Sequence, residues 1–203
     1  MNNEHYLKDL SEIKNLMTKS SRFISLSGLS GILAGIYALI GAAVAFYLVN
    51  SFSRGTLYIF NGWVFWTCMA ILIMVALLSA ATGVILTVRK AKKNGEKIWD
   101  VSSKRLLLNF LIPLAVGGIY CLIILYQGRY GQTAGLMLIF YGLALVSASK
   151  YSLGDIRYLG YTEILLGLIA AAYPGYGFWL WVLGFGIMHI IYGTWMHFKY
   201  DSK

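Results

Sequence analysis

Two residues with ionisable side chains lie within long apolar stretches of the sequence, Glu163 and His189. The segment 173–177 between them, with the sequence YPGYG, is a predicted turn because proline and glycine interrupt helices. In an antiparallel hairpin that turns near residue 176, these two residues lie at equal depth, so we expect them to face each other. A carboxyl group beside an imidazole can bind and release a proton, or hold a polar ligand.

Further polar residues are candidates for the same site or for its surroundings. Tyr120, Tyr141 and Tyr192 lie on neighbouring predicted helices and could complete the ligand- or proton-binding site. Asp155 and His197 form a second acid–histidine pair with the same spacing about the turn. We expect this second pair at the cytoplasmic rim of the same hairpin.

A structural interpretation of Glu163 and His189 competes with the functional one. A charged side chain inside a membrane helix costs about 2.5–3.5 kcal/mol on insertion scales, so a retained one is a candidate for function. A hydrogen-bonded clasp between two membrane helices contributes only about 0.6–2 kcal/mol. Both interpretations are open at the level of sequence.

The composition predicts the elements that position these residues. Of the 203 residues, 59% are hydrophobic and only 12% are charged, which is typical of a membrane protein. Long apolar runs predict an all-α polytopic membrane protein whose six transmembrane helices form three hairpins. The predicted spans are about 23–49, 59–88, 106–127, 131–149, 157–173 and 177–197, within a transmembrane domain of 23–198.

The distribution of basic residues predicts the orientation. All Lys and Arg residues except Arg54 and Arg129 fall on one predicted side, which also explains the net charge of +9 without a nucleic-acid partner. The positive-inside rule places that side in the cytoplasm. We therefore expect a multi-pass protein of the inner or plasma membrane with both termini cytoplasmic, ending in a tail of 199–203.

Two cytoplasmic segments carry features that suggest partners. The arm 1–22 places Tyr6, Leu10, Ile13 and Met17 on one face of an amphipathic helix. This helix could lie on the inner leaflet, pair in a homo-oligomer or cover the bundle. The basic connection 89–105 is expected to contact anionic lipid of the inner leaflet.

Glycines recur at helical spacing and predict close helix packing. The first predicted helix contains Gly28, Gly31 and Gly35, and its pattern aligns with that of the fifth helix; a second pattern is shared by the even-numbered helices, which suggests an internal repeat of three hairpins. In the last hairpin we expect Gly160 opposite Gly193, and Gly167 opposite Gly186.

Within the segment 158–196, the run 167–174 with the sequence GLIAAAYP at one turn and the pair Tyr192-Gly193 near a helix end resemble the HdeD-type bacterial acid-stress membrane proteins. The arm 1–22 and the long connection 89–105 depart from that pattern. The resemblance implies a bacterial inner-membrane protein of helical hairpins without a known catalytic motif. It assigns no functional residue.

Motifs for catalysis, cofactors and metals are missing from the sequence. The sequence contains no phosphate-binding loop, no dinucleotide-binding fingerprint and no pair of cysteines at metal-binding spacing. We therefore expect no cofactor and no metal. Ser27 or Ser30 with His189 lacks the motif context of an intramembrane protease. The leading hypothesis is a non-enzymatic membrane protein that binds a small molecule, lipid or proton in transport, sensing or stress tolerance. Alternatives are a structural or regulatory partner that assembles through its N-terminal helix, and an enzyme acting on lipid-like substrates.

Overall fold

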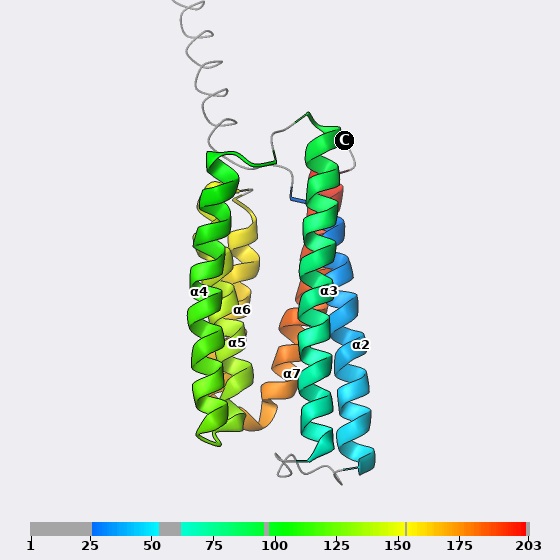
Figure 1. The fold of residues 1–203 in the computed structure, drawn as a ribbon, viewed down its shortest axis with the longest axis vertical. Coiled ribbons are helices and arrows are strands. Elements are labelled where there is room, and N and C mark those ends of the chain that lie inside the picture. The colour runs from blue at the N-terminus through cyan, green and yellow to red at the C-terminus, as the bar shows by residue number, and fades with distance from the viewer. Residues whose placement is uncertain (1–25, 53–61, 96–97, 153, 202–203) are drawn as a thin grey trace, which may run out of the picture.

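The computed structural model of the protein describes residues 26–52, 62–95, 98–152 and 154–201 (Figure 1). Within these ranges the regular structure is entirely helical. The elements are α2 (Gly28–Phe52), α3 (Trp63–Lys93), α4 (Val101–Tyr126), α5 (Thr133–Ala148), α6 (Ile156–Ala172), α7 (Gly177–Trp181), the π-helical segment η4 (Val182–Met188), α8 (His189–Met196) and the π-helical segment η5 (His197–Asp201). The elements from α7 to η5 follow one another without a break and are called the last span below.

The prediction of an all-helical protein with apolar spans is confirmed in the described part of the chain. Five helical stretches are long and apolar enough to cross a membrane; they are Gly28–Phe52, Trp63–Lys93, Val101–Tyr126, Tyr130–Tyr151 and Pro174–Asp201. The remaining long helix, α6, lies before the last of these stretches in the chain; it has 17 residues and carries Glu163. At 1.5 Å per residue it covers about 26 Å, slightly less than the roughly 30 Å of a hydrocarbon core. The amphipathic helix predicted over 1–22 lies outside the described residues.

Helix ends fall where the local sequence supplies a cap or a break. α4 begins at a capping box, in which the Asp100 carboxylate accepts a hydrogen bond from the Ser103 backbone N–H at 2.7 Å. The same helix ends at Tyr126, and two residues beyond it Gly128 turns the chain with a φ of +75°, which glycine adopts at little cost. Pro174 opens the short turn that separates α6 from the last span.

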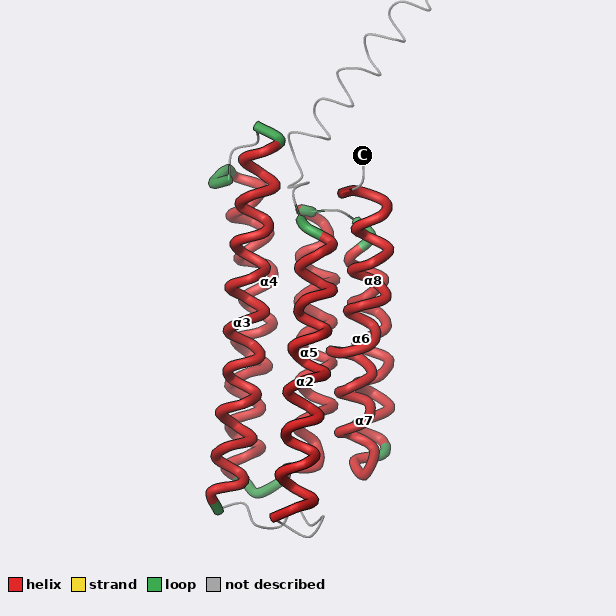
Figure 2. Tube along the Cα trace, turned by 90° about the vertical axis from the view of Figure 1, so that its right-hand side faces the viewer, coloured by secondary structure: helices red, strands yellow, loops and turns green. Residues whose placement is uncertain are grey.

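The helices form two layers of three, as Figures 1 and 2 show from two sides. One layer contains α3, α2 and the last span, with α2 packed between the other two. The other layer contains α4, α5 and α6, with α5 in the middle. The layers meet mainly where α7 and η4 of the last span contact α5 and α6.

Glycines bring helices together within each layer, in pairs that differ from the prediction. A Cβ added to Gly160 would lie 2.8 Å from the carbonyl oxygen of Gly142 on α5. A Cβ added to Gly193 would lie 2.8 Å from the carbonyl oxygen of Gly28 on α2. Gly160 and Gly193 therefore do not face each other, and the expected opposition within the last hairpin is wrong.

The remaining predicted packing glycines follow the same arrangement. Gly167 lies against Gly135 of α5, whereas Gly186 packs beneath Leu39 of α2. Gly31 and Gly35 line the α2 surface that meets the last span. The small-residue faces of α6 and the last span are occupied by other helices, which is why these two helices meet through larger side chains instead.

Candidate functional site

Glu163 lies on the face of α6 that points toward the other layer and is completely buried. Its Oε1 atom lies 3.4 Å from Nδ1 of His189 on the last span. Neither carboxyl oxygen has a hydrogen-bond partner within the described residues. A buried carboxyl group without partners is costly, and this cost marks the position as a candidate for function.

His189 begins α8 and is held by hydrogen bonds on both ring nitrogens. Nδ1 lies 3.0 Å from the carbonyl oxygen of Gly184, and Nε2 lies 2.8 Å from the hydroxyl oxygen of Tyr141. A carbonyl can only accept, so Nδ1 carries a proton and donates it to Gly184. In the neutral ring Nε2 then accepts the hydroxyl proton of Tyr141. The imidazole thus lies between a phenol and a carboxyl group.

The π-helical segment η4 creates the backbone geometry around His189. Its wider turns precede His189 directly and include Gly184 and Gly186. A Cβ added to Gly184 would lie 2.5 Å from Glu163 Oε2 and 2.6 Å from Cδ2 of Leu138. Only glycine lets the carboxyl group approach the last span this closely. Single π-helical turns occur frequently at functional sites.

Aromatic rings surround the imidazole of His189. The ring of Phe185 stacks on it at 5.8 Å between centroids, and the ring of Tyr141 lies 5.3 Å away. Trp181 and Phe110 extend this cluster against Phe185 and Tyr141, respectively.

The structure separates two of the predicted tyrosines from the pair. Tyr120 on α4 is 43% exposed and contacts the ring of Phe140. Tyr192 lies one turn beyond His189, packed against a buried cluster that includes Ala148. Its buried hydroxyl group has no hydrogen-bond partner among the residues that the structure describes. Among the described residues, Tyr141 is the one of the three tyrosines that forms a hydrogen bond with His189.

The predicted rim pair of Asp155 and His197 does not form. Asp155 instead accepts hydrogen bonds from Lys199 at 2.5 Å and from the Tyr200 hydroxyl at 2.8 Å. The prediction assumed α-helical geometry throughout, whereas His197, Lys199 and Tyr200 lie in the π-helical segment η5, which places more residues in the same length of helix. The partners of Asp155 therefore lie two and three residues beyond His197 along the chain. The hydrogen bond from Lys199 lowers the pKa of Asp155.

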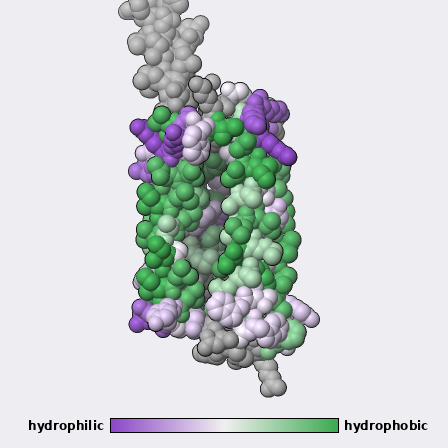
Figure 3. All heavy atoms as spheres, in the orientation of Figure 1, coloured by the Kyte–Doolittle hydropathy of each residue, from purple (hydrophilic) through white to green (hydrophobic). Residues whose placement is uncertain are grey.

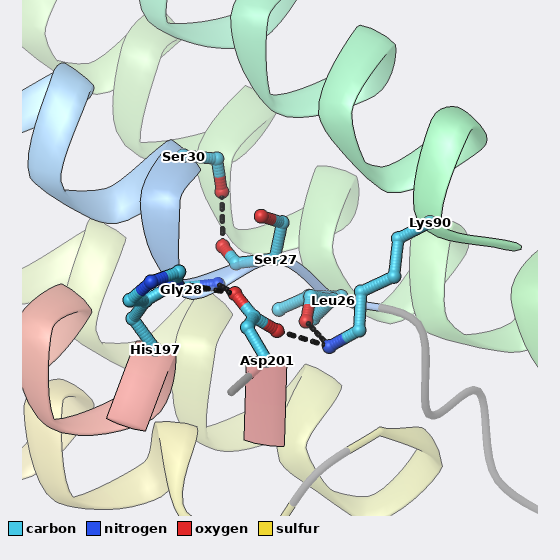
Figure 4. A network of polar contacts seen from close by, with 7 residues as sticks. All are labelled: Leu26, Ser27, Gly28, Ser30, Lys90, His197 and Asp201. Atoms are coloured by element: carbon cyan, nitrogen blue, oxygen red, sulfur yellow. Dashed lines mark hydrogen bonds and ion pairs between the residues drawn. The ribbon is translucent and has the colours of Figure 1, made fainter. Parts of the chain in front are cut away.

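His197 takes part in a polar network that the sequence analysis missed (Figure 4). Asp201 accepts hydrogen bonds from the backbone N–H of Gly28 at 2.9 Å and is paired with His197 at 3.1 Å. It also forms an ion pair with Lys90, whose ammonium group donates to the carbonyl of Leu26. The spacing of four between His197 and Asp201 was a signal in the sequence that could have indicated this pair, because residues four apart lie on the same face of a helix. The network joins the start of α2 to the ends of α3 and η5.

The described residues contain no group of three or more His, Cys, Asp or Glu side chains that could hold a metal ion. At the seam between the layers, Glu163, His189 and Tyr141 follow one another in a row of polar side chains. Such a row can accept, hold and pass on a proton.

Comparisons of the protein with protein-family models, with curated proteins and with solved structures find no match.

Proposed function

We propose that this protein is a non-enzymatic membrane protein that binds and releases a proton at Glu163, in transport, sensing or stress tolerance. The observation that carries the proposal is a fully buried carboxyl group whose two oxygens have no hydrogen-bond donor in the described part of the chain, next to a histidine with a defined donor nitrogen. Protonation of either group changes the charge of the seam between the two layers. A membrane protein can couple such a change to movement of its helices.

The space around Glu163 favours a proton over a larger ligand. The tight approach of Oε2 to Gly184 leaves no room for even a methyl group on that side of the carboxylate. Leu138, which is also fully buried, borders the same space. A small molecule or a lipid chain would have to displace the last span from α5 and α6, whereas a proton requires no displacement.

The proposal includes an orientation in the membrane. Exposed cations lie at the ends of α3 and η5 and at the starts of α4 and α6, and these helix ends share one end of the molecule (Figure 1). Arg129 follows α4, whose last residues lie at the other end. By the positive-inside rule the first end is cytoplasmic, and both termini lie there. Protons would reach Glu163 from that side, past Tyr192, whose buried hydroxyl group lies between the rim and His189 along the last span.

A pH titration of the infrared spectrum of the purified protein in lipid bilayers tests the proposal. The chain has eight Asp and Glu residues, which all absorb as C=O when protonated. The wild-type protein should therefore show one carboxylic-acid component, appearing as pH falls, that is lost in Glu163→Gln while the components of the other acids remain. The matched control Asp155→Asn removes a carboxyl group at the rim and should keep this component. If Glu163→Gln and wild type give the same pH-dependent spectrum, Glu163 does not titrate, and the pair is a structural clasp.

A further inference from the structure

The two layers diverge on the side of the molecule formed by α3 and α4. These helices follow each other in the sequence, yet they do not pack against each other along their length, and neither do the central helices α2 and α5. Figure 3 views this side and shows a recess that runs lengthwise between two apolar columns of atoms, α3 and α4. We call this recess the interlayer cleft.

One face of α3 lines the interlayer cleft with small side chains. Phe65 on this helix contacts the ring of Tyr130 in the short 3-10 turn Tyr130–Gln132 that precedes α5, so this face of α3 points toward the other layer. Ala76 and Gly83 lie on the same face, because the spacings 65–76 and 76–83 are close to whole numbers of helical turns. Ala76 is exposed, and a Cβ at Gly83 would meet no atom within 4 Å. The cleft is therefore open beside α3.

The cytoplasmic end of the interlayer cleft is flanked by exposed cations. Lys92 and Lys93 end α3, and Lys104 and Arg105 lie in the first turn of α4. Figure 3 shows hydrophilic residues above both apolar columns.

The described acids at this end have other partners. Asp100 belongs to the capping box of α4, Asp155 binds Lys199, and Asp201 binds Lys90. None of the three is paired with the four exposed cations. Lys104 also lies over the ring of Trp99, 5.9 Å from its centroid, a contact that leaves its ammonium group free to bind an anion on the other side. The charges of the four cations are therefore not neutralised by a described acid.

We propose that the interlayer cleft is a binding site for one anionic phospholipid, with an acyl chain between α3 and α4 and the phosphate headgroup at the cations above it. An apolar cleft open to the bilayer interior matches an acyl chain. A cluster of basic side chains at the membrane surface matches an anionic headgroup. The two features are adjacent on the same pair of helices, and a phospholipid has the same two parts in the same order. This site does not include Glu163, and the proposal does not depend on proton binding there.

Native mass spectrometry of the full-length protein titrated with phosphatidylglycerol or phosphatidylcholine tests this site. Wild type should retain one phosphatidylglycerol more tightly than phosphatidylcholine. Lys93→Gln with Lys104→Gln should weaken phosphatidylglycerol binding about thirtyfold, because each basic residue near an anionic lipid contributes roughly fivefold. The control pair Lys150→Gln with Arg157→Gln removes two cations at the same end of the molecule, at α5 and α6, and should leave binding unchanged.

A second pair of variants tests the apolar part of the site. Ala76→Phe fills the cleft and should abolish the bound lipid, whereas Ala81→Phe places the same ring on the opposite face of α3 and should not. Equal thermal unfolding of the two variants shows that both are folded. Equal affinity for the two lipids, or equal effects of Ala76→Phe and Ala81→Phe, would overturn the proposal. So would a dimer that Ala76→Phe dissociates without changing lipid binding, because the cleft would then hold a second copy of the chain.

Discussion

At the scale of single residues, the arrangement around Glu163 depends on one glycine. Gly184 supplies the carbonyl that fixes the proton on Nδ1 of His189, and its missing side chain provides the space for the carboxyl group. The same residue therefore sets the tautomer of the histidine and its distance from the acid. The sequence shows no sign of this role, because membrane helices contain many glycines that serve only packing.

Replacing Gly184 with alanine should destabilise the protein. The added Cβ would overlap both Glu163 Oε2 and Leu138, and overpacking of this kind typically costs about 1–3 kcal/mol. Thermal unfolding in detergent measures the change. The control Gly118→Ala introduces a methyl group where no atom lies within 4 Å. It should raise the stability by up to about 1 kcal/mol, through the higher helix propensity of alanine. Equal stability of both variants would contradict the geometry described for Gly184.

The polar contacts of Asp155 predict a dependence of stability on pH. Lys199 lowers the pKa of this carboxyl group, so its ionised form stabilises the folded protein. The contribution is fully present above the ordinary aspartate pKa of about 3.9, and it is lost as pH falls through the lowered pKa. Asp155→Asn should therefore unfold at a lower temperature than wild type at neutral pH, with the difference disappearing in acid.

Lys199→Gln provides the control for this effect. The two substitutions remove the same ion pair, so the double variant should be no less stable than either single variant. The difference at neutral pH is expected to be small because Lys199 is exposed. A difference between wild type and Asp155→Asn that persists unchanged at acid pH would show that the asparagine acts through packing rather than charge.

At the scale of elements, apolar runs and breaks indicate where the helices lie, although several predicted ends are wrong by up to five residues. The predicted helix 106–127 begins five residues after α4 does, and the predicted helix 59–88 ends five residues before α3 does, because charged residues continue both helices beyond the apolar runs. The fifth predicted helix, 157–173, corresponds to α6 within one residue, because Pro174 sets its end and the charged segment before Arg157 sets its start. The partners of the helices could not be predicted in the same way. A glycine face such as Gly160 and Gly167 predicts close packing but does not identify the helix that fills it.

The π-helical segments η4 and η5 are the other feature that the sequence did not reveal. They leave the pairing of Glu163 with His189 intact and change the pairing at the rim, where Asp155 contacts Lys199 and Tyr200. Composition alone does not distinguish a π-helical turn from an α-helical one in an apolar run. The candidate site was thus predictable in its central pair, whereas Gly184 and the Asp201 network required the structure.

At the scale of the whole molecule, polar contacts connect the two layers at two levels. Tyr141, His189 and Glu163 join them within the bundle, and Asp155 with Lys199 and Tyr200 joins them at the rim. The described partners of Asp201 all belong to the layer of α2 and α3. The last span therefore packs within one layer through Gly186 and Gly193, and it meets the other layer through these ionisable groups and through apolar side chains such as Leu183. A change of protonation acts on the connection between the layers and leaves the packing within each layer in place.

The proposed orientation places the contacts of Asp155 at the cytoplasmic surface, which site-directed labelling can test. In a background with Cys68 and Cys121 replaced by alanine, Asn94→Cys at the end of α3 and Gln127→Cys at the end of α4 lie at opposite ends of the bundle. Because basic residues surround position 94, a membrane-impermeant thiol reagent should label Gln127→Cys in intact cells and Asn94→Cys only after permeabilisation. The reverse pattern would place Asp155 and the cation cluster outside the cell. The proton path and the phosphate site would then face the opposite compartment.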